Sequence, residues 1–412
     1  MKTLFTGYLN KETPEEEPES TTSGEAPGVS TLSLQNVRRN LGNAYHSIAY
    51  GKWRRKDDVL EDCNSQIWIL GRWYLPQGQG SSYEEDCPLF FHDYYSRIWL
   101  TYRRDFNPLG GTTKTTDCGW GCMIRSSQMM VAQALTVLHL RRAYRLTEKT
   151  QEDLRSIIKI FEDKSDADLG IHKLMELAGD SAVGNWFTPS RAMALVRDAV
   201  LRSDHEYLKD LRIYLSADNC IILNEIEELS ECWTKAVILV ICVRLGTKKI
   251  NECYKHHVKS VLSFESSIGA IGGRPKHSVY FVGFHGDTLF HLDPHVAQKY
   301  LSLDSEEEKV WKTFHCRKPT RMKIDEMDPS CAFGFLVRNE DEFKALLKQL
   351  ADSGIIECSQ HTGDSPRKHL KSTNTLFSVM EERISPEHLV NEFESSDNVD
   401  EDEEELHGFE VV

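Results

Sequence analysis

The sequence predicts an α+β fold, and three segments carry that prediction. A run that begins at Cys122 repeats apolar residues at helical spacing. The apolar stretch 235–245 has the length and composition of a central strand. Segments 278–284 and 288–292 read as two strands of a hairpin joined by His-Gly-Asp. A helix followed by a sheet built from later strands is the layout of an α+β protein.

The remaining elements follow from the same periodicities. A short strand that ends in a turn is expected at 67–71, and a helix at 150–160. A second helix is expected at 189–202, with Ser190 as its N-cap. Asn339 begins a capping-box-like pattern before a further helix. The apolar side of that helix would consist of Phe343, Leu346, Leu347 and Leu350.

The charge of the chain is concentrated at its two ends. The 412 residues carry a formal charge of −15, of which residues 391–412 contribute ten acidic side chains and no Lys or Arg. Residues 1–30 are also acidic, so the middle is nearly neutral and gives no basic platform for nucleic acid. We therefore expect a disordered N-terminal tail at 1–30, a catalytic domain at 31–352 and a flexible acidic tail at 353–412.

The eleven cysteines are scattered and form no dense disulfide framework. The first residues lack the apolar core of a signal peptide, and the most apolar run, 236–243, has the length of a buried strand. These features predict a cytoplasmic protein in a reducing compartment, with mostly free thiols.

Cys122 is the strongest candidate for a catalytic residue. It follows a Gly-Trp-Gly approach and opens a helix, where the macrodipole and unpaired N–H groups favour a thiolate. Gly119 and Gly121 would permit close approach to a substrate carbonyl. Cys118 is a weaker rival, because it lies in the preceding loop.

Asp293 and His295 supply the other parts of a thiol hydrolase. They end a strand-like run, and residues two apart on an extended backbone point to one face. Asp293 would orient the imidazole, and His295 would take the thiol proton and later protonate the leaving amine. The cleft would then lie between the helix that bears Cys122 and the sheet.

Other candidates have simpler readings from the residues alone. Tyr102 could donate its hydroxyl to an oxyanion, although a core tyrosine is the plainer reading. Trp186 reads as a packed aromatic, and the segment 272–275, which contains Gly273 and Pro275, reads as a loop. The Cys118-x₃-Cys122 spacing suits zinc, but no second Cys/His pair with matching spacing follows. We expect no metal and no cofactor.

The acidic tail ends in a short motif that combines an aromatic and an aliphatic residue. Phe409 and Val412, three apart in an extended segment, could enter two apolar pockets by strand addition. The alternative is a solvated acidic tail without a partner.

Several of these segments together resemble the autophagy-4 cysteine proteases, the autophagins, nearer to the longer C/D-type animal branch. The resemblance covers roughly residues 60–350 and keeps the order of the family's motifs. They are residues 68–72 (WILGR), 99–106 (WLTYRRDF), 116–125 (TDCGWGCMIR), 271–275 (IGGRP) and 292–295 (LDPH). The family usually has another residue at the position of Cys118, which leaves a redox role for that thiol open.

This resemblance implies a papain-like fold with a small additional subdomain. It implies a protease that cleaves after the C-terminal glycine of autophagy-8-type ubiquitin-like modifiers, the light-chain-3/GABARAP class. It also implies release of these modifiers from phosphatidylethanolamine, and so transient proximity to membranes. Cys122, His295 and Asp293 would be the triad, with Tyr102 as oxyanion donor.

The same resemblance assigns substrate-binding roles. Trp186 and the loop with Gly273 and Pro275 would form a lid over a slot for glycine, and Phe409 and Val412 a modifier-binding motif. The alternatives are a catalytically weak protein that regulates by binding the modifier, or a protease for another ubiquitin-like protein.

Overall fold

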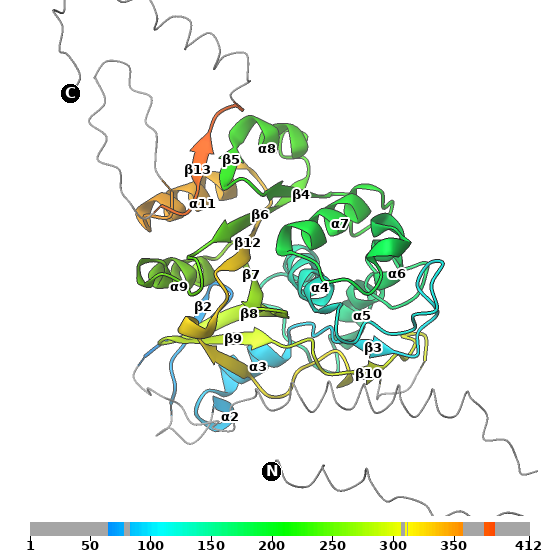
Figure 1. Ribbon diagram of the computed structural model, residues 1–412. Coiled ribbons are helices and arrows are strands. Elements are labelled where there is room, and N and C mark those ends of the chain that lie inside the picture. Colours follow the sequence, from blue (N-terminus) through cyan, green and yellow to red (C-terminus); the bar gives the residue numbers. More distant parts are fainter. Residues whose placement is uncertain (1–64, 78–82, 306–309, 311, 357–374, 384–412) are drawn as a thin grey trace, which may run out of the picture. The chain divides into compact units, whose positions relative to one another are not determined.

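The computed structural model describes residues 65–77, 83–305, 310, 312–356 and 375–383 (Figure 1). Phe409 and Val412 lie outside these residues, as do the predicted N-terminal tail and most of the acidic tail. No helix in the described ranges is both long and apolar enough to cross a bilayer.

A mixed sheet forms the centre of the domain. Its strands lie in the order β11-β9-β8-β7-β12-β6-β4, and β1 pairs with β8 and with β2. All neighbours are antiparallel except β4 and β6. The strands of this sheet are β1 (Ile67–Ile69), β2 (Arg72–Tyr74), β4 (Leu211–Ser216), β6 (Ala236–Arg244), β7 (Ser267–Arg274), β8 (His277–His285), β9 (Thr288–Leu292), β11 (Thr320–Lys323) and β12 (Ser330–Val337).

Helices cover both faces of the sheet (Figure 1). One face carries α4 and α7, and the other carries α9 and α11. The helices are α2 (Tyr83–Asp86), α3 (Pro88–Tyr95), α4 (Cys122–Leu135), α5 (Gln151–Lys159), α6 (Ile171–Ala178), α7 (Pro189–Leu201), α8 (Leu223–Leu229), α9 (Lys255–Ser263) and α11 (Glu340–Asp352). Short turns of helix are η1 (Thr136–Leu140, a π-helix), η2 (Asp180–Ala182), η3 (Glu252–Tyr254) and η4 (Ile324–Glu326).

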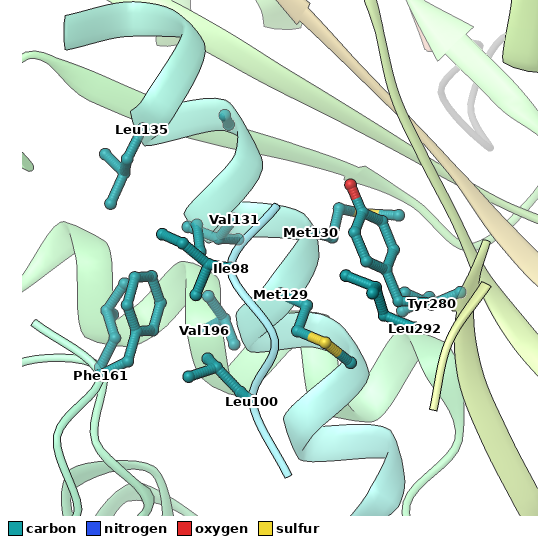
Figure 2. Close-up of a cluster of buried hydrophobic side chains, with 14 of the residues drawn as sticks. Ile98, Leu100, Met129, Met130, Val131, Leu135, Phe161, Val196, Tyr280 and Leu292 are labelled. Atoms are coloured by element: carbon teal, nitrogen blue, oxygen red, sulfur yellow. The ribbon is translucent and has the colours of Figure 1, made fainter. Parts of the chain in front are cut away.

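Strand β6 explains why its sequence is apolar without alternation. Ile238 and Val240 belong to the core under α4 and α7, whereas Val237 and Leu239 belong to the core under α9 and α11. A strand covered on both faces buries every side chain and therefore reads as a continuous apolar run. Figure 2 shows part of the first core, where α4 lies against residues of the sheet.

The predicted helices and strands of the domain are confirmed, with one change of cap. The nucleophile helix begins at Cys122, and the strand and hairpin predictions correspond to β6, β8 and β9. Asn339 caps α11 by accepting a hydrogen bond from the Glu342 N–H. The N-cap of α7 is Thr188 rather than Ser190, since its hydroxyl accepts from Arg191 N–H and Pro189 takes the first helical position.

The hairpin of β8 and β9 contains a bulge. Gly283 pairs with Phe290, but Phe281 pairs with His291, so Val282 is an extra residue on β8. Gly283 is required there, because a Cβ would lie 2.0 Å from the Trp68 carbonyl oxygen on β1.

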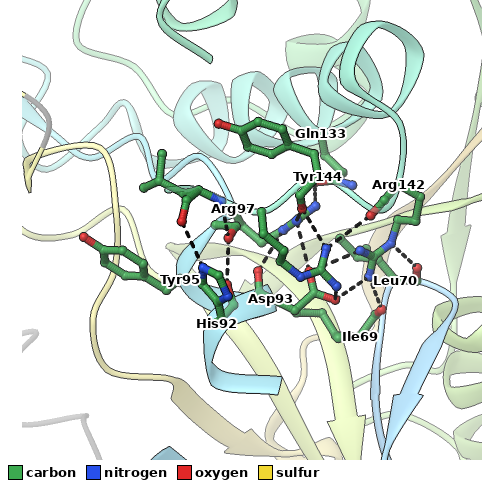
Figure 3. A network of polar contacts seen from close by, with 12 residues as sticks. Ile69, Leu70, His92, Asp93, Tyr95, Arg97, Gln133, Arg142 and Tyr144 are labelled. Carbon is green, nitrogen blue, oxygen red and sulfur yellow. Dashed lines mark hydrogen bonds and ion pairs between the residues drawn. The ribbon is translucent and has the colours of Figure 1, made fainter. Parts of the chain in front are cut away.

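A buried charge network ties α3 to the strand β1 and to the segment after η1 (Figure 3). Asp93 is fully buried and forms ion pairs with Arg97 at 3.0 Å, Arg142 at 2.9 Å and Arg145 at 2.9 Å. Arg142 also donates to the carbonyl oxygens of Ile69 and Leu70. Both oxygens of the carboxylate thus face cationic donors, which a buried charge needs to be tolerated.

Part of the segment that we assigned to the flexible tail belongs to the domain. Strand β13 (Ser378–Met380) pairs in parallel with β5 (Cys220–Ile222) beside α8. Leu376 and Phe377 are buried in the core under α11. The apolar pair Leu376-Phe377 explains the docking, because its burial offsets the ordering of the chain.

Candidate active site

The thiol of Cys122 lies at the first turn of α4 and is buried next to the other candidate catalytic residues. His295, the Ser278 backbone N–H and the Tyr102 side chain all lie close enough to this thiol to favour its thiolate. Burial opposes the thiolate, but His295 and the other donors outweigh it and hold the pKa of Cys122 below its usual range. In Cys118, burial and the neighbouring Asp117 raise the pKa to about 12. The ranking of Cys122 over Cys118 thus has an electrostatic basis.

Asp293 and His295 meet as a close pair. The Nδ1 of His295 lies 2.6 Å from Oδ1 of Asp293. Burial disfavours the charged ring, but the carboxylate outweighs it and raises the pKa of His295 to about 9. The same ion pair lowers the pKa of Asp293, against its burial. With the thiol, this geometry favours a thiolate–imidazolium pair at neutral pH.

The backbone that carries the pair differs from our expectation. β9 ends at Leu292, and Asp293-Pro294-His295 forms a turn rather than an extended segment. The two side chains still converge because Asp293 Oδ1 also accepts the backbone N–H of His295 at 2.9 Å. The Trp99 indole N–H donates to the Asp293 carbonyl oxygen at 2.8 Å and fixes the turn from outside.

Tyr102 is placed against the same pair. Its ring meets the His295 ring edge-on at 5.3 Å, and its N–H donates to the Pro294 carbonyl oxygen. With only 1% of its surface exposed, Tyr102 is a core tyrosine whose hydroxyl reaches the nucleophile. The two readings of this residue are therefore compatible.

The predicted lid residues line a pocket beside the thiol. The pocket has a volume of about 210 Å³, and its walls include Cys122, Trp186, Gly273 and Pro275. Trp186 is half-exposed, and its indole N–H donates to the Gly119 carbonyl oxygen at 2.7 Å. Lys276 places its ammonium 4.6 Å from the Trp186 ring centroid. The indole and the turn between β7 and β8 therefore face each other across the approach to Cys122.

Two glycines of the site, Gly121 and Gly273, are required because a side chain at either position would clash with its neighbours. A Cβ on Gly121 would lie 2.6 Å from the buried Asp117 carboxylate, and one on Gly273 would lie 2.1 Å from the His277 carbonyl oxygen. Asp117 accepts from the Arg103 N–H and from the Arg125 guanidinium, whose other side contacts Asp163. Gly121 thus lets the loop before Cys122 pack against this ion network. From the sequence we had expected it only to permit close approach of the substrate.

One larger cavity lies elsewhere. It has a volume of about 340 Å³ and is lined by Arg72, Arg141, Ser266, Leu336 and Leu346 among others, with none of the predicted site residues. Cavity size therefore does not locate the chemistry in this domain; the converging titratable groups do.

Comparison with known proteins identifies the family. The Peptidase C54 catalytic domain matches residues 87–349. Cysteine protease atg-4.2 of Caenorhabditis elegans is 36% identical over 92% of this chain and 78% of its own length. Cysteine protease ATG4D of Xenopus laevis is 32% identical over 81% and 80%, and human Cysteine protease ATG4C is 31% identical over 78% and 86%.

The chain belongs to the Peptidase C54 family. It is an Atg4-type cysteine protease with a papain-like fold, which confirms the resemblance found in its motifs. The nine cysteines of this C54 protease that the structure describes are all free thiols.

Sequence analysis missed one residue of this site, His277. Its ring is stacked on that of His295, with centroids 3.7 Å apart and planes 6° apart. The hairpin alone gave no signal for it, because the register set at the turn, continued without the bulge at Val282, would place Ser278 opposite His295. His277, Asp293 and His295 place possible metal ligands within 4.8 Å of one another. Parallel stacked rings point their lone pairs side by side rather than at one point, so this arrangement does not favour a metal ion.

Proposed function

We propose that this protease cleaves the peptide bond after the C-terminal glycine of autophagy-8-type ubiquitin-like modifiers and releases them from phosphatidylethanolamine. The observation that carries the proposal is the placement of Cys122, His295 and Asp293 beside a pocket that Trp186 and Pro275 line. Family membership supports the substrate class. The free thiols among the described residues support action in a reducing compartment such as the cytoplasm.

The first half of the reaction forms a thioester. The Cys122 thiolate attacks the glycyl carbonyl carbon, and the carbonyl electrons move to oxygen. Tyr102 donates its hydroxyl to that oxyanion. When the tetrahedral intermediate collapses, the C–N bond breaks, and the His295 imidazolium gives its proton to the departing amine. The amine is that of the next residue in a precursor, or of the ethanolamine headgroup in a conjugate.

The second half restores the thiolate. His295, now neutral, takes a proton from water, which attacks the thioester carbonyl. The C–S bond then breaks, the modifier leaves with a free glycine carboxylate, and Cys122 is again paired with the imidazolium. Asp293 keeps its charge throughout and stabilises each cationic form of His295.

The pocket explains why glycine would be required. Trp186 and the β7–β8 turn both line the pocket that leads to the thiol. A Cβ next to the reacting carbonyl would have to displace one of these walls. A substrate with alanine in place of the terminal glycine should therefore be cut at least about tenfold more slowly.

The test is incubation with a panel of C-terminally extended modifiers and modifier–phosphatidylethanolamine conjugates, followed by mass spectrometry of the products. The wild-type enzyme should cut only after the terminal glycine, and Cys122→Ala should be inactive on every member. Cleavage of another ubiquitin-like protein in preference to these would assign a different substrate. Tight binding without turnover by the wild type would indicate a regulator that only holds the modifier.

A further inference from the structure

The hairpin that ends at the catalytic turn places a second histidine beside His295. Tyr280 on β8 pairs with Leu292 on β9. Three residues before Tyr280 is His277, and three residues after Leu292 is His295, so the continued antiparallel register sets the two histidines opposite each other. Their stacking at 3.7 Å shows that the contact persists beyond the last regular pair.

The two rings share one carboxylate. His295 Nδ1 lies 2.6 Å from Asp293 Oδ1, while His277 Nε2 lies 3.9 Å from Asp293 Oδ2. The second distance is too long for a hydrogen bond, so His277 contacts the pair mainly through the face of its ring. His277 is 5% exposed and His295 is 1% exposed, so the stack excludes water from one side of the base.

The charges of the stack are unequal. The titratable groups around His277 are His295, Asp293, His291 and Arg274. Burial and the positive charge of His295 outweigh Asp293 and lower the pKa of His277 to about 3. At neutral pH the stack is therefore a neutral imidazole lying on an imidazolium, an arrangement in which the π-face attracts the cation.

We propose that His277 is a positioning residue, whose ring holds the plane of the His295 imidazolium so that Nε2 stays directed at the Cys122 thiol. Asp293 holds the ring only at Nδ1, so small coupled rotations about the two side-chain torsions of His295 could still tilt its plane. The His277 face on one side and the Tyr102 edge restrict that tilt. This inference rests on the proposed roles of Cys122 and His295.

Two substitutions separate the ring from its polar atoms. His277→Asn keeps polar atoms attached to Cγ but removes the aromatic ring. His277→Phe keeps a flat ring and loses both nitrogens. If the face is what matters, His277→Asn should lower kcat about tenfold with little change in KM, as expected when a catalytic group is slightly misplaced. His277→Phe should retain most of the activity.

A second readout follows the ion pair directly. The rate at which iodoacetamide alkylates Cys122, measured against pH, reports the formation of the thiolate. Loss of the stacked face destabilises the imidazolium, so the acid limb of this profile should move to higher pH by about one unit in His277→Asn. In His277→Phe it should stay close to that of the wild type.

His285→Asn is the matched control, because His285 is another buried histidine of β8 and lies at its far end, against Tyr83. It should leave the alkylation profile unchanged, even where it lowers the melting temperature. An unshifted profile in His277→Asn, or an equal shift in the control, would overturn the positioning role. Full activity of Cys122→Ala would instead overturn the proposed function itself, so the two failures are distinguishable.

Discussion

Two buried aspartates in this domain have opposite surroundings. Asp93 faces three arginines and the Tyr74 hydroxyl, so each of its charged partners stays protonated at any physiological pH. Asp293 faces histidine, whose charge depends on a proton that it can release. A buried carboxylate therefore fixes structure when its partners are permanent cations and prepares chemistry when its partner can titrate.

The pKa values of the cations that pair with the two aspartates show the same contrast. Burial lowers the pKa of Arg97 to about 10, and the two nearby arginines act in the same direction, yet the guanidinium remains charged at neutral pH. The His295 ring, by contrast, has its pKa raised to about 9, within reach of the thiol that it serves. Only the second network can exchange a proton with a substrate during turnover.

The largest expected effect separates the two networks by activity. Cys122→Ala, His295→Ala and the double variant should each lower kcat/KM by at least about a thousandfold, and the double variant should be no worse than the worse single one. The reason is that the two residues act as one ion pair. The unfolding midpoint of Cys122→Ala in urea should stay near that of the wild type, whereas His295→Ala leaves Asp293 without its buried counter-charge and should lower it. Losses that multiply in the double variant would mean that the residues act independently.

The second expected effect is a loss of stability without a loss of activity. Asp93→Asn should lower the free energy of unfolding by about 3 to 5 kcal/mol, because it leaves buried guanidinium groups without a counter-charge. Urea denaturation followed by intrinsic fluorescence measures this loss. The kcat of the molecules that remain folded should be unchanged, since Asp93 touches no residue of the site. A lower kcat with normal stability would contradict the division between the networks.

The third effect is a pH dependence. The active pair needs His295 protonated, and its pKa is raised to about 9, so kcat/KM should decline as pH rises through that value. On the acid side activity should fall as the Cys122 thiolate, whose pKa is lowered, becomes protonated. Initial rates on a fluorogenic modifier substrate between pH 5 and 10 would define both limbs. A decline near the ordinary histidine pKa would show that Asp293 does not stabilise the cation.

The smallest effect concerns residues outside the described ones. Phe409→Ala with Val412→Ala should weaken binding of the modifier a few-fold and leave kcat at saturation unchanged, because a tethered motif raises only local concentration. Calorimetry with the catalytically inactive Cys122→Ala enzyme would measure the affinity. Equal affinity with and without these side chains would leave the tail as solvated acidic sequence.

The sequence could predict what local chemistry determines. The start of α4 at Cys122, the Asn339 cap and the turn of the hairpin follow from residue types within a few positions of one another. Asp293 and His295 are also neighbours in sequence, although their backbone forms a turn where we expected an extended strand. Long-range contacts were harder to predict. The Asp93 network joins segments far apart in the sequence, and nothing near each charged residue shows which other residue it will pair with.

His277 and the docked residues 375–383 show the two ways in which such contacts escape prediction. The position of His277 depends on strand register, which a single irregular residue changes. Leu376 and Phe377 lie between stretches of polar composition, and a window average hides a pair of apolar side chains that fills a gap in the core. Composition describes a segment, whereas packing depends on individual residues.

The bulge at Val282 determines which residue meets the catalytic base. Between the turn and Gly283, β8 and β9 follow one register, and beyond Phe281 they follow another that is displaced by one position. Had the first register continued, Ser278 would stand opposite His295 and His277 would point to the other face of the sheet. Deleting Val282 would leave His277 opposite His295 and remove only the bulge, whereas inserting one residue between Ser278 and Tyr280 would place Ser278 there instead. In this hairpin, a change of length is thus equivalent to a substitution, and natural or engineered variation should tolerate new residues in the 285–287 turn far more readily than within β8.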